Sequence, residues 1–248
     1  MPRKTERRPT AEDLAAGALA SLETRGTRAR RDVASWYCPT RMRPLGVAAP
    51  GYREVARDLR RRLREAPPAD VLSAARALLA TGAMEAAHIG YGLLGSREDA
   101  LRLLGAREVE ALARPLDNWA TVDTFCACVS GPAWRLGLLS DGFLRRWSRS
   151  KDRWRRRAAL VSTVALNQRA WGGTGDTPRT LALCEALVDD RDDMVVKALS
   201  WALRALAVRD PAAARSFLAR HGDRVAGRVR REVTSKLDTG RKHPSRPP

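Results

Sequence analysis

Two residues that could do chemistry on a cationic centre stand four positions apart, at Trp119 and Asp123. On a helix this spacing places both side chains on one face, one turn apart. An indole ring attracts positive charge through its quadrupole, and a carboxylate stabilises a cation directly. Taken singly, Trp119 could equally be a core residue and Asp123 a surface charge. The pair therefore indicates a possible site for a positively charged group.

A weak internal repeat connects this pair to two further residues, Arg157 and Trp201. The segments Arg157-Ala158-Ala159-Leu160 and Lys197-Ala198-Leu199 are offset by 40 positions, and 40 positions before Arg157 lies Asp117. A period near 40 with paired helices is typical of HEAT and armadillo repeats, which stack and leave a concave groove. If the repeats stack, all four side chains could line one face. Trp201 could also be core, and Arg157 belongs to an arginine run that could be a solvated face.

The elements that must position these residues are helices. Leu and Ala recur at three- and four-residue spacing, while strand signals are almost absent. The prediction is an all-α fold, an α-solenoid of HEAT-like antiparallel helix pairs with a concave basic groove. Breaks are expected at Pro and Gly residues, Gly131 among them. Helices are expected over residues 10–24, 33–37, 52–65, 68–80, 83–94, 96–104, 107–113, 118–130, 132–138, 141–149, 152–168, 177–188, 192–208, 210–221 and 223–237.

Three parts are expected along the chain. Residues 1–31 form a basic N-terminal segment with one helix capped by Thr10, followed by a basic loop from Arg25 to Arg31. Residues 32–238 form the repeat domain. Residues 239–248 read as a disordered basic tail.

The charge balance favours a polyanionic partner. The net charge is +18, and residues 32–238 alone hold 35 basic and 24 acidic residues. Such an excess is expected for a surface that attracts polyanions. The alternative is a merely solvated basic surface. GC-rich codon usage would explain why arginine is preferred to the five lysines, but not the basic excess itself.

Several other classes of site are disfavoured. Cys38, Cys126, Cys128 and Cys184 form no CxxC pair and the three histidines are scattered, so neither a metal site nor a disulfide framework is expected, and reduced thiols in the cytoplasm fit best. No cofactor motif is apparent. No apolar run approaches 18 residues, so no membrane span or export signal is expected. The loop Gly172–Gly175 is not expected to bind phosphate, because no strand precedes it.

The combination of residues suits the loss of an alkylated purine. A purine alkylated at N3 or N7 is cationic, so its glycosidic bond is already weakened and no general acid is needed. A carboxylate near the sugar would stabilise the oxocarbenium-like centre that develops. An arginine could grip a flanking phosphate by bidentate hydrogen bonds.

The sequence also resembles the DNA alkylation repair glycosylases of the AlkD-like family, which are built from HEAT-like repeats. The resemblance spans about residues 32–238. The fainter matches are Gly46-Val47-x-x-Pro50 with Arg53 following, and Arg230-Arg231-Glu232 near the end. The main matching segments are Asn118-Trp119-x-x-Val122-Asp123, Trp154-x-x-Arg157-Ala158-Ala159 and Lys197-Ala198-x-x-Trp201-x-Leu203-Arg204, with Asp210-Pro211 beyond.

The resemblance implies roles for these positions. Trp119 and Trp201 would flank the deoxyribose of the lesion, and Asp123 would stabilise the oxocarbenium ion and position the attacking water. Arg157 would hold the backbone phosphate. Further phosphate contacts would come from Arg156, Lys197, Arg53 and Arg230.

The implied enzyme is a monofunctional glycosylase that hydrolyses the N-glycosidic bond of N3-alkyladenine and N7-alkylguanine in duplex DNA without a base-flipping pocket. No lysine stands at a matched catalytic position, so a Schiff-base lyase step is not suggested. A monomer associated with the nucleoid is expected. Two departures stand out: Asn118 replaces a second tryptophan of some relatives, which is expected to change packing, and Ala48 replaces a polar residue facing the DNA.

Two other functions remain open. One is a non-catalytic HEAT-like protein that binds damaged, bent or branched DNA, since members of a superfamily can keep a fold and lose its chemistry. The other is a protein-interaction solenoid.

Overall fold

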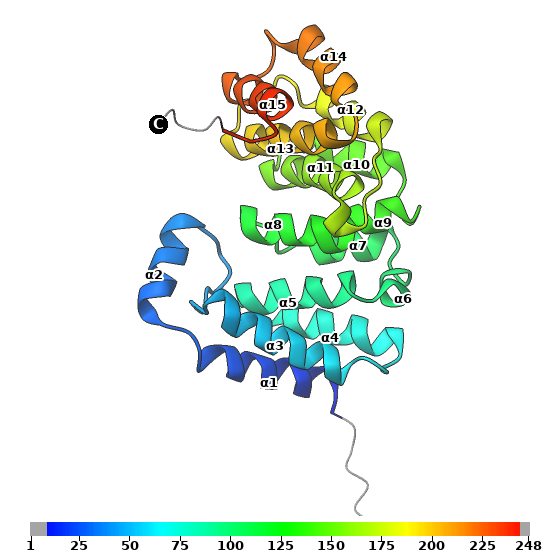
Figure 1. Cartoon of the computed structure of the whole chain (residues 1–248). Coiled ribbons are helices and arrows are strands. Elements are labelled where there is room, and N and C mark those ends of the chain that lie inside the picture. The colour runs from blue at the N-terminus through cyan, green and yellow to red at the C-terminus, as the bar shows by residue number, and fades with distance from the viewer. Residues whose placement is uncertain (1–8, 244–248) are drawn as a thin grey trace, which may run out of the picture. The chain divides into compact units, whose positions relative to one another are not determined.

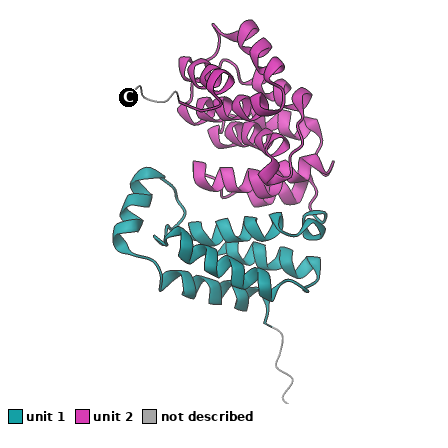
Figure 2. Ribbon diagram, in the orientation of Figure 1, with its two compact units in different colours: residues 1–103 teal, residues 104–248 magenta. Residues whose placement is uncertain are grey.

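The computed structural model describes residues 9–243, which are mainly helical (Figure 1). The chain forms two compact units, residues 1–103 and 104–248 (Figure 2). No β-strand occurs within the described residues; isolated bridges join Gly26 to Val47 and Arg43 to Ala83. None of the described helices is long and apolar enough to cross a membrane. The predicted all-α solenoid class is confirmed, while the concave basic groove stays a prediction.

The first unit contains α1 (Ala11–Glu23), α2 (Arg28–Tyr37), α3 (Ala49–Arg62), α4 (Pro68–Ala80), α5 (Met84–Gly95) and α6 (Glu98–Leu101). Helices α1, α3, α4 and α5 pack on one another around a shared apolar core. The Thr10 cap is present: the Thr10 hydroxyl accepts from the Asp13 N–H, and the Asp13 carboxylate accepts from the Thr10 N–H. Because α1 contributes to this core, it belongs to the same folded unit as the helices that follow it.

Helix α2 differs from its expected form. It begins at Arg28, where a loop was expected, after Thr27, whose hydroxyl accepts from the Arg30 N–H. None of its residues is buried, and the Trp36 side chain is 82% exposed. Its apolar residues Val33, Trp36 and Tyr37 have helical spacing and are all exposed, so α2 contributes nothing to the core. The boundary expected at residue 31 falls inside α2, and residues 1–8 of the expected basic segment lie outside the described residues.

A buried carboxylate fixes the turn that leads into α3. Glu85, on α5, accepts hydrogen bonds from the backbone N–H groups of Leu45, Gly46 and Val47, at 2.9, 2.8 and 3.1 Å. Gly46 has a φ of +72°, and a Cβ there would lie 2.5 Å from the Thr27 carbonyl oxygen. Only glycine fits such a position without strain. The Gly46-Val47 motif is therefore a structural turn anchored by Glu85.

The second unit stacks helices in two rows. The long row contains α8 (Trp119–Phe125), α9 (Gly131–Arg135), α11 (Arg153–Asn167), α13 (Asp193–Arg209) and α15 (Gly227–Thr239). The short row contains α10 (Asp141–Ser148), α12 (Thr177–Ala186) and α14 (Pro211–His221), each packed against neighbours in the long row. Helix α7 (Ala106–Ala113) precedes both rows, and a 3₁₀ turn, Arg169–Trp171, follows α11.

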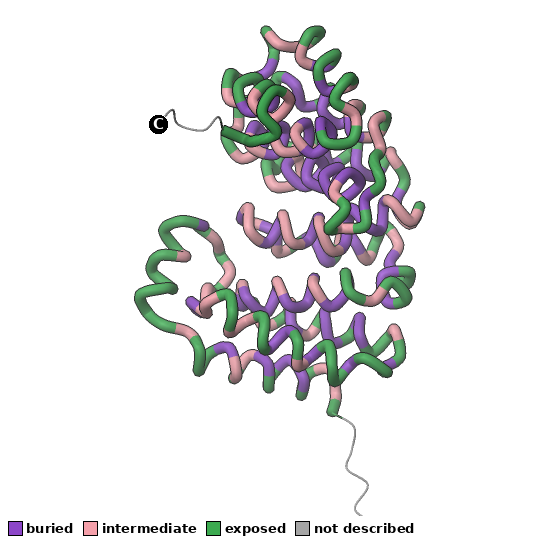
Figure 3. The backbone as a smooth tube through the Cα atoms, in the orientation of Figure 1, coloured by how far each residue is buried: buried purple, intermediate pink, exposed green. Residues whose placement is uncertain are grey.

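The long row preserves the predicted repeat in imperfect form. Its helices α8, α11, α13 and α15 begin at residues 119, 153, 193 and 227, so successive starts are 34, 40 and 34 residues apart. Every residue of α11 from Arg157 to Asn167 is buried, because α8, α9, α10, α12 and α13 all pack on it (Figure 3). Its buried polar side chains are hydrogen-bonded inside the unit, among them Ser162, Thr163 and Asn167. Helix α11 is thus the central element of this unit.

The expected break at Gly131 is wrong. A π-helical turn, Cys126–Ser130, joins α8 directly to α9, and the Gly131 N–H donates to the carbonyl of Cys126. Pro132 has no N–H, and its ring would clash with a carbonyl in a regular α-helix, so a wider turn accommodates it. A Cβ at Gly131 would lie 2.4 Å from the Ala165 Cβ of α11. Glycine here allows the two helices to approach closely.

The expected disordered tail begins inside a helix. Helix α15 ends at Thr239, after which Gly240 has a φ of +71°. The Lys236 ammonium donates to the Gly240 carbonyl, and the Ser235 hydroxyl donates to the Arg241 carbonyl. Residues 244–248 lie outside the described residues.

Candidate functional site

Helix α8 presents the two residues with which the sequence analysis began. The buried Asn118 caps it, since its side-chain oxygen accepts a 2.9 Å hydrogen bond from the Thr121 N–H. Asparagine is among the best residues at this position, because its side chain satisfies an amide that the helix cannot. Asn118 therefore starts the helix whose first two turns carry Trp119 and Asp123.

Asp123 forms a bidentate ion pair with Arg157 of α11. The Arg157 Nε donates to Asp123 Oδ1 at 2.9 Å, and Nη2 donates to Oδ2 at 2.8 Å. The Arg157 Nη1 donates to the Met194 carbonyl at the start of α13, at 2.6 Å. One guanidinium thus joins three helices of the long row. The Arg157 side chain is 6% exposed, whereas Asp123 keeps 18% of its side chain open.

The environment of Asp123 disfavours its charged form. Burial raises the pKa of the Asp123 carboxyl, while the hydrogen bonds and positive charge of Arg157 lower it and are outweighed. Each carboxylate oxygen accepts one hydrogen bond from Arg157 and retains a lone pair. A partly open carboxylate in such a site interacts with a nearby cation more strongly than one in water.

The two predicted tryptophans are half-buried and occupy different helices. Trp119 lies at the start of α8, one turn before Asp123, and Trp201 lies in the middle of α13. The Trp201 ring meets the Trp171 ring edge-on, with centroids 5.7 Å apart. Sequence reasoning did not single out Trp171, although it directly precedes Gly172, whose φ of +76° ends the 3₁₀ turn. A tryptophan beside a glycine-rich turn is the signal that could have identified it.

Trp201 also lines a basic pocket of about 470 Å³. Its wall includes Arg204, and the Arg204 Nε lies 3.8 Å from the Glu232 carboxylate. Burial lowers the pKa of Arg204, and the negative charge of Glu232 offsets only part of this effect. Burial disfavours the charged form of Glu232, but the Ser200 hydroxyl and the positive Lys242, Arg204 and Arg228 outweigh it and lower its pKa. The other basic residues that line the pocket are Arg169, Arg209, Lys236 and Lys242.

The sequence profile of a family described as DNA alkylation repair enzyme matches residues 18–237. The chain belongs to this family. A role in DNA repair follows from that membership. The match covers both units and includes α8, α11 and α13, which carry the Asp123–Arg157 pair and the two tryptophans.

A solved structure supports the fold independently. It is described as a predicted DNA alkylation repair enzyme from Enterococcus faecalis, with a TM-score of 0.67 and 17% sequence identity. The similarity covers 87% of this chain and 98% of that one. At this level of identity the likeness shows a shared fold. No curated protein matches the sequence.

Within this family member, the residues expected to bind phosphate have different surroundings. The Arg156 Nε donates to Asp190 at 2.7 Å, and its Nη1 donates to the carbonyls of Ser150 and Lys151. Arg157 is committed to Asp123 and Met194, as described above. Both side chains therefore hold neighbouring segments together, a structural role that the sequence did not reveal. Phosphate binding by either remains a prediction.

The other three expected phosphate contacts are accessible. The Lys197 ammonium lies 2.7 Å from Asp193 and is 42% exposed. Arg230 on α15 is exposed, and so is Arg53 on α3 of the first unit. Their roles toward DNA remain predictions.

The described residues contain no group of three or more histidine, cysteine, aspartate or glutamate side chains placed to hold a metal ion. Beside Asp123, burial raises the pKa of the Cys126 thiol to about 12, and its sulfur donates to the Ala158 carbonyl. A thiol with such a pKa is not a nucleophile near neutral pH. Asp123, by contrast, is a partly open carboxylate, and its role in chemistry remains a prediction.

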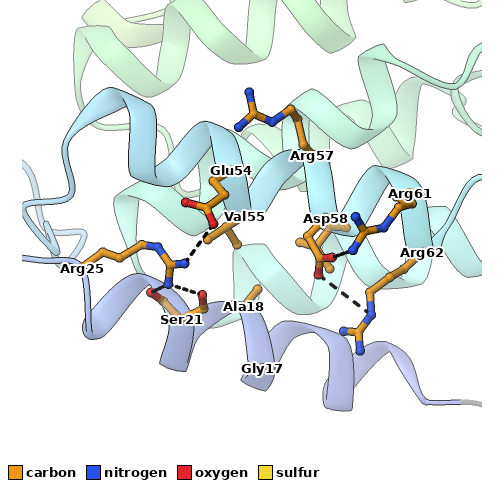
Figure 4. Close-up of a pocket in the computed structure, with 11 residues that line it drawn as sticks. Gly17, Ala18, Ser21, Arg25, Glu54, Val55, Arg57, Asp58, Arg61 and Arg62 are labelled. Carbon is orange, nitrogen blue, oxygen red and sulfur yellow. Dashed lines mark hydrogen bonds and ion pairs between the residues drawn. The ribbon is translucent and has the colours of Figure 1, made fainter.

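A larger groove lies in the first unit, between α1 and α3 (Figure 4). Its volume is about 850 Å³. Figure 4 shows its carboxylates paired with arginines: Glu54 lies 3.4 Å from Arg25, and Asp58 lies 2.5 Å from Arg61. These exposed pairs bridge or flank two helices and leave no group poised for chemistry, so size alone does not identify the site.

Proposed function

We propose that the chain is a monofunctional DNA glycosylase that removes N3- and N7-alkylated purines, such as 3-methyladenine and 7-methylguanine, from duplex DNA. The observation that carries this proposal is Asp123, a half-buried carboxylate held in a fixed orientation by Arg157, one turn from Trp119. Family membership supports alkylated DNA as the substrate.

The reaction follows from the charge of the lesion. The bond between C1′ and N9 of the alkylated purine breaks, and its electron pair goes to the base, which leaves as a neutral molecule. The positive charge moves to the sugar as an oxocarbenium-like ion. Asp123 would stabilise that ion electrostatically, because its charge is fixed in place before the reaction begins. Water then attacks C1′ and loses a proton, leaving an abasic site.

The ion pair with Arg157 has two consequences for this mechanism. It prevents the Asp123 side chain from rotating, which keeps the carboxylate oriented toward the reacting sugar. It also fixes the Arg157 guanidinium beside the site, where the phosphate contact expected of Arg157 would be made. The half-buried Trp119 and Trp201 rings would contact the deoxyribose, and Trp171 would hold the Trp201 ring edge-on.

The test is release of 7-methylguanine from methylated duplex DNA. Wild type is expected to release the base, and Asp123→Asn is expected to slow release about 100- to 1,000-fold, as for removal of one electrostatic contact to a transition state. Asp238→Asn is a matched control, because Asp238 is exposed and pairs with Arg215 on the surface. No release by wild type, or full activity of Asp123→Asn, would exclude the proposal.

A non-catalytic DNA-binding protein is the second candidate. The observation that favours it is the same ion pair, since a buried carboxylate bound to arginine can be purely structural. In that case wild type would bind alkylated duplex but release no base. Binding that weakens with salt is common to both candidates, so the release assay separates them.

A further inference from the structure

A second basic pocket lies in the second unit, away from Asp123. It has a volume of about 650 Å³ and is lined by α7, α10, the loop after α10 and the first turn of α11. The residues that line it are Glu110, Gly142, Arg145, Arg146, Trp147, Arg149, Ser150 and Arg155. It therefore holds four guanidinium groups and a single carboxylate.

Arg145 and Arg146 of α10 and Arg149 directly after it, called the α10 arginines below, differ from the arginines of α11. On α11, Arg153, Arg156 and Arg157 each pair with an aspartate. Within the described part of the chain, no carboxylate lies within ion-pair distance of Arg145, Arg146 or Arg149, and all three are exposed. Asp141 attracts Arg145 at longer range, which contributes to the lowered pKa of that carboxyl. The α10 arginines remain available to an external anion.

Arg155 adds an unsatisfied donor to this pocket. Its Nη2 lies 2.9 Å from the Glu110 carboxylate, and its guanidinium lies over the Trp147 ring, 5.2 Å from the centroid. Its Nη1 is buried without a hydrogen-bond partner among the described residues. An unpaired buried donor is costly, so such groups usually have a partner when the protein is in its working state.

The pocket has a fixed frame. The Trp147 Nε1 donates to Glu110 at 2.8 Å, which links α10 to α7. The Arg156 guanidinium donates to the carbonyls of Ser150 and Lys151, which fixes the loop between α10 and α11. The arginines therefore project from backbone held in place on both sides.

We infer that this pocket binds backbone phosphates of duplex DNA outside the reacting nucleotide. The inference rests on the proposed function, which makes DNA the partner. Guanidinium groups match phosphate oxygens in charge and geometry, and a row of them neutralises successive phosphates. Arg155 and Arg157 are two residues apart in α11, which is about 3 Å along the helix axis, on nearly opposite faces. A duplex lying across this end of α11 could contact the pocket while Asp123 faces the lesion.

The experiment measures binding of an undamaged, fluorescein-labelled duplex by anisotropy between 50 and 200 mM NaCl. The variant is Arg145→Gln/Arg146→Gln/Arg149→Gln. We expect its affinity to fall at least about tenfold, and the slope of log affinity against log salt to fall by about 0.9 for each phosphate that the variant no longer neutralises. The single-turnover excision rate at saturating enzyme is expected to stay within about twofold, because these residues do not touch the reacting sugar.

The matched control is Arg215→Gln/Arg220→Gln/Arg224→Gln, which removes the same charge from exposed arginines that have acidic partners. An equal drop in affinity in the control would show a general charge effect and overturn the pocket assignment. Unchanged affinity and slope in the α10 variant would also overturn it, and would favour an acidic protein as the ligand. Failure of excision by wild type would instead count against the proposed function.

Discussion

The two units each bury a carboxylate, and the partners of these two groups differ. In the first unit Glu85 is enclosed by three backbone N–H groups. In the second unit Asp123 is held by the side chain of Arg157 and remains partly open. Backbone amides belong to the fold itself, so Glu85 stabilises one turn, and only 6% of this residue is exposed. Asp123 keeps unused lone pairs, which is what a reacting centre requires.

The comparison also separates two ways of disrupting such a site. The partners of Glu85 can be removed only by substitution to proline, because every other residue supplies an amide. The partner of Asp123 can be removed without altering the carboxylate. Asp123 and Arg157 can therefore be tested singly and together, whereas Glu85 must be changed itself.

The largest effect is expected for Arg157→Met. This change leaves Asp123 buried without its counter-charge, and we expect the free energy of unfolding of the second unit to fall by about 3–5 kcal/mol. Intrinsic fluorescence in a urea titration is a suitable measurement, because six of the seven tryptophans, all except Trp36, lie in this unit. A decrease below about 1 kcal/mol would mean that the pair contributes little to the fold.

The double variant Asp123→Asn/Arg157→Met sharpens this result. With the unpaired charge removed, we expect much of the stability to return, since the cost of an uncompensated buried charge is avoided. Excision is expected to remain absent. Recovery of both stability and excision would show that neither residue takes part in the chemistry.

A smaller effect is expected for Glu85→Gln in the first unit. A glutamine can accept from two of the three amides, but its NH₂ group would face the third. We expect the free energy of unfolding to fall by about 1–3 kcal/mol, as for one unsatisfied buried donor. Hydrogen exchange at Leu45, Gly46 and Val47 should accelerate, while the single-turnover excision rate at saturating enzyme should stay within about twofold.

Glu54→Gln is the control for that measurement, because Glu54 is an exposed carboxylate of α3 paired with Arg25. It should leave the exchange of the turn unchanged. If Glu85→Gln abolished excision without altering exchange, the contrast between a structural and a reactive carboxylate would not hold.

The smallest effect concerns pH. Burial raises the pKa of Asp123 above its ordinary value of 3.8, so the carboxylate becomes protonated at a higher pH than an ordinary aspartate. Excision needs the charged form and should decline with a midpoint above 3.8 as pH falls, by at most about tenfold per pH unit. Rates are measured in single turnover, with enzyme-free DNA correcting for acid depurination. A midpoint at or below 3.8 would contradict the raised pKa.

The same shift has the opposite sign for stability. The folded unit binds the Asp123 proton more tightly than the unfolded chain does. Between the unfolded and folded pKa values, this group therefore stabilises the fold more as pH falls and less as pH rises. Over that window, stability from Asp123 and excision should change in opposite directions.

Local sequence signals predicted the helices better than the contacts between them. Helix α11 was expected over residues 152–168 and spans Arg153–Asn167, because Asp152 caps it and a long apolar run follows. The contact between Asp123 and Arg157 joins residues 34 positions apart, and no local pattern specifies such a pairing. The same limit applies to Trp171 and Trp201, and to Glu85 and the turn that it anchors.

Two errors have simple physical reasons. Gly131 predicts a break because glycine usually ends helices, but here it allows close packing against Ala165. Arg28–Arg31 resembles a loop in the sequence because it holds three arginines and no large apolar residue, and the apolar stripe of α2 begins only at Val33. Residue type and resemblance single out Asp123 and Arg157 for chemistry; the structure adds that they form one bonded unit.

The π-helical turn between α8 and α9 affects the direction in which the Asp123 side chain points relative to α9. Such a turn contains one residue more than the α-helical turn it replaces, and each residue rotates a helix by about 100°. The direction in which Trp119 and Asp123 point is thereby offset from the face on which α9 packs against α11. A single-residue deletion within Cys126–Ser130 would restore the α-helical phase. It would rotate either the face that carries Trp119 and Asp123 or the face of α9 that packs on α11. The number of residues in this turn therefore determines the direction of the Asp123 carboxylate.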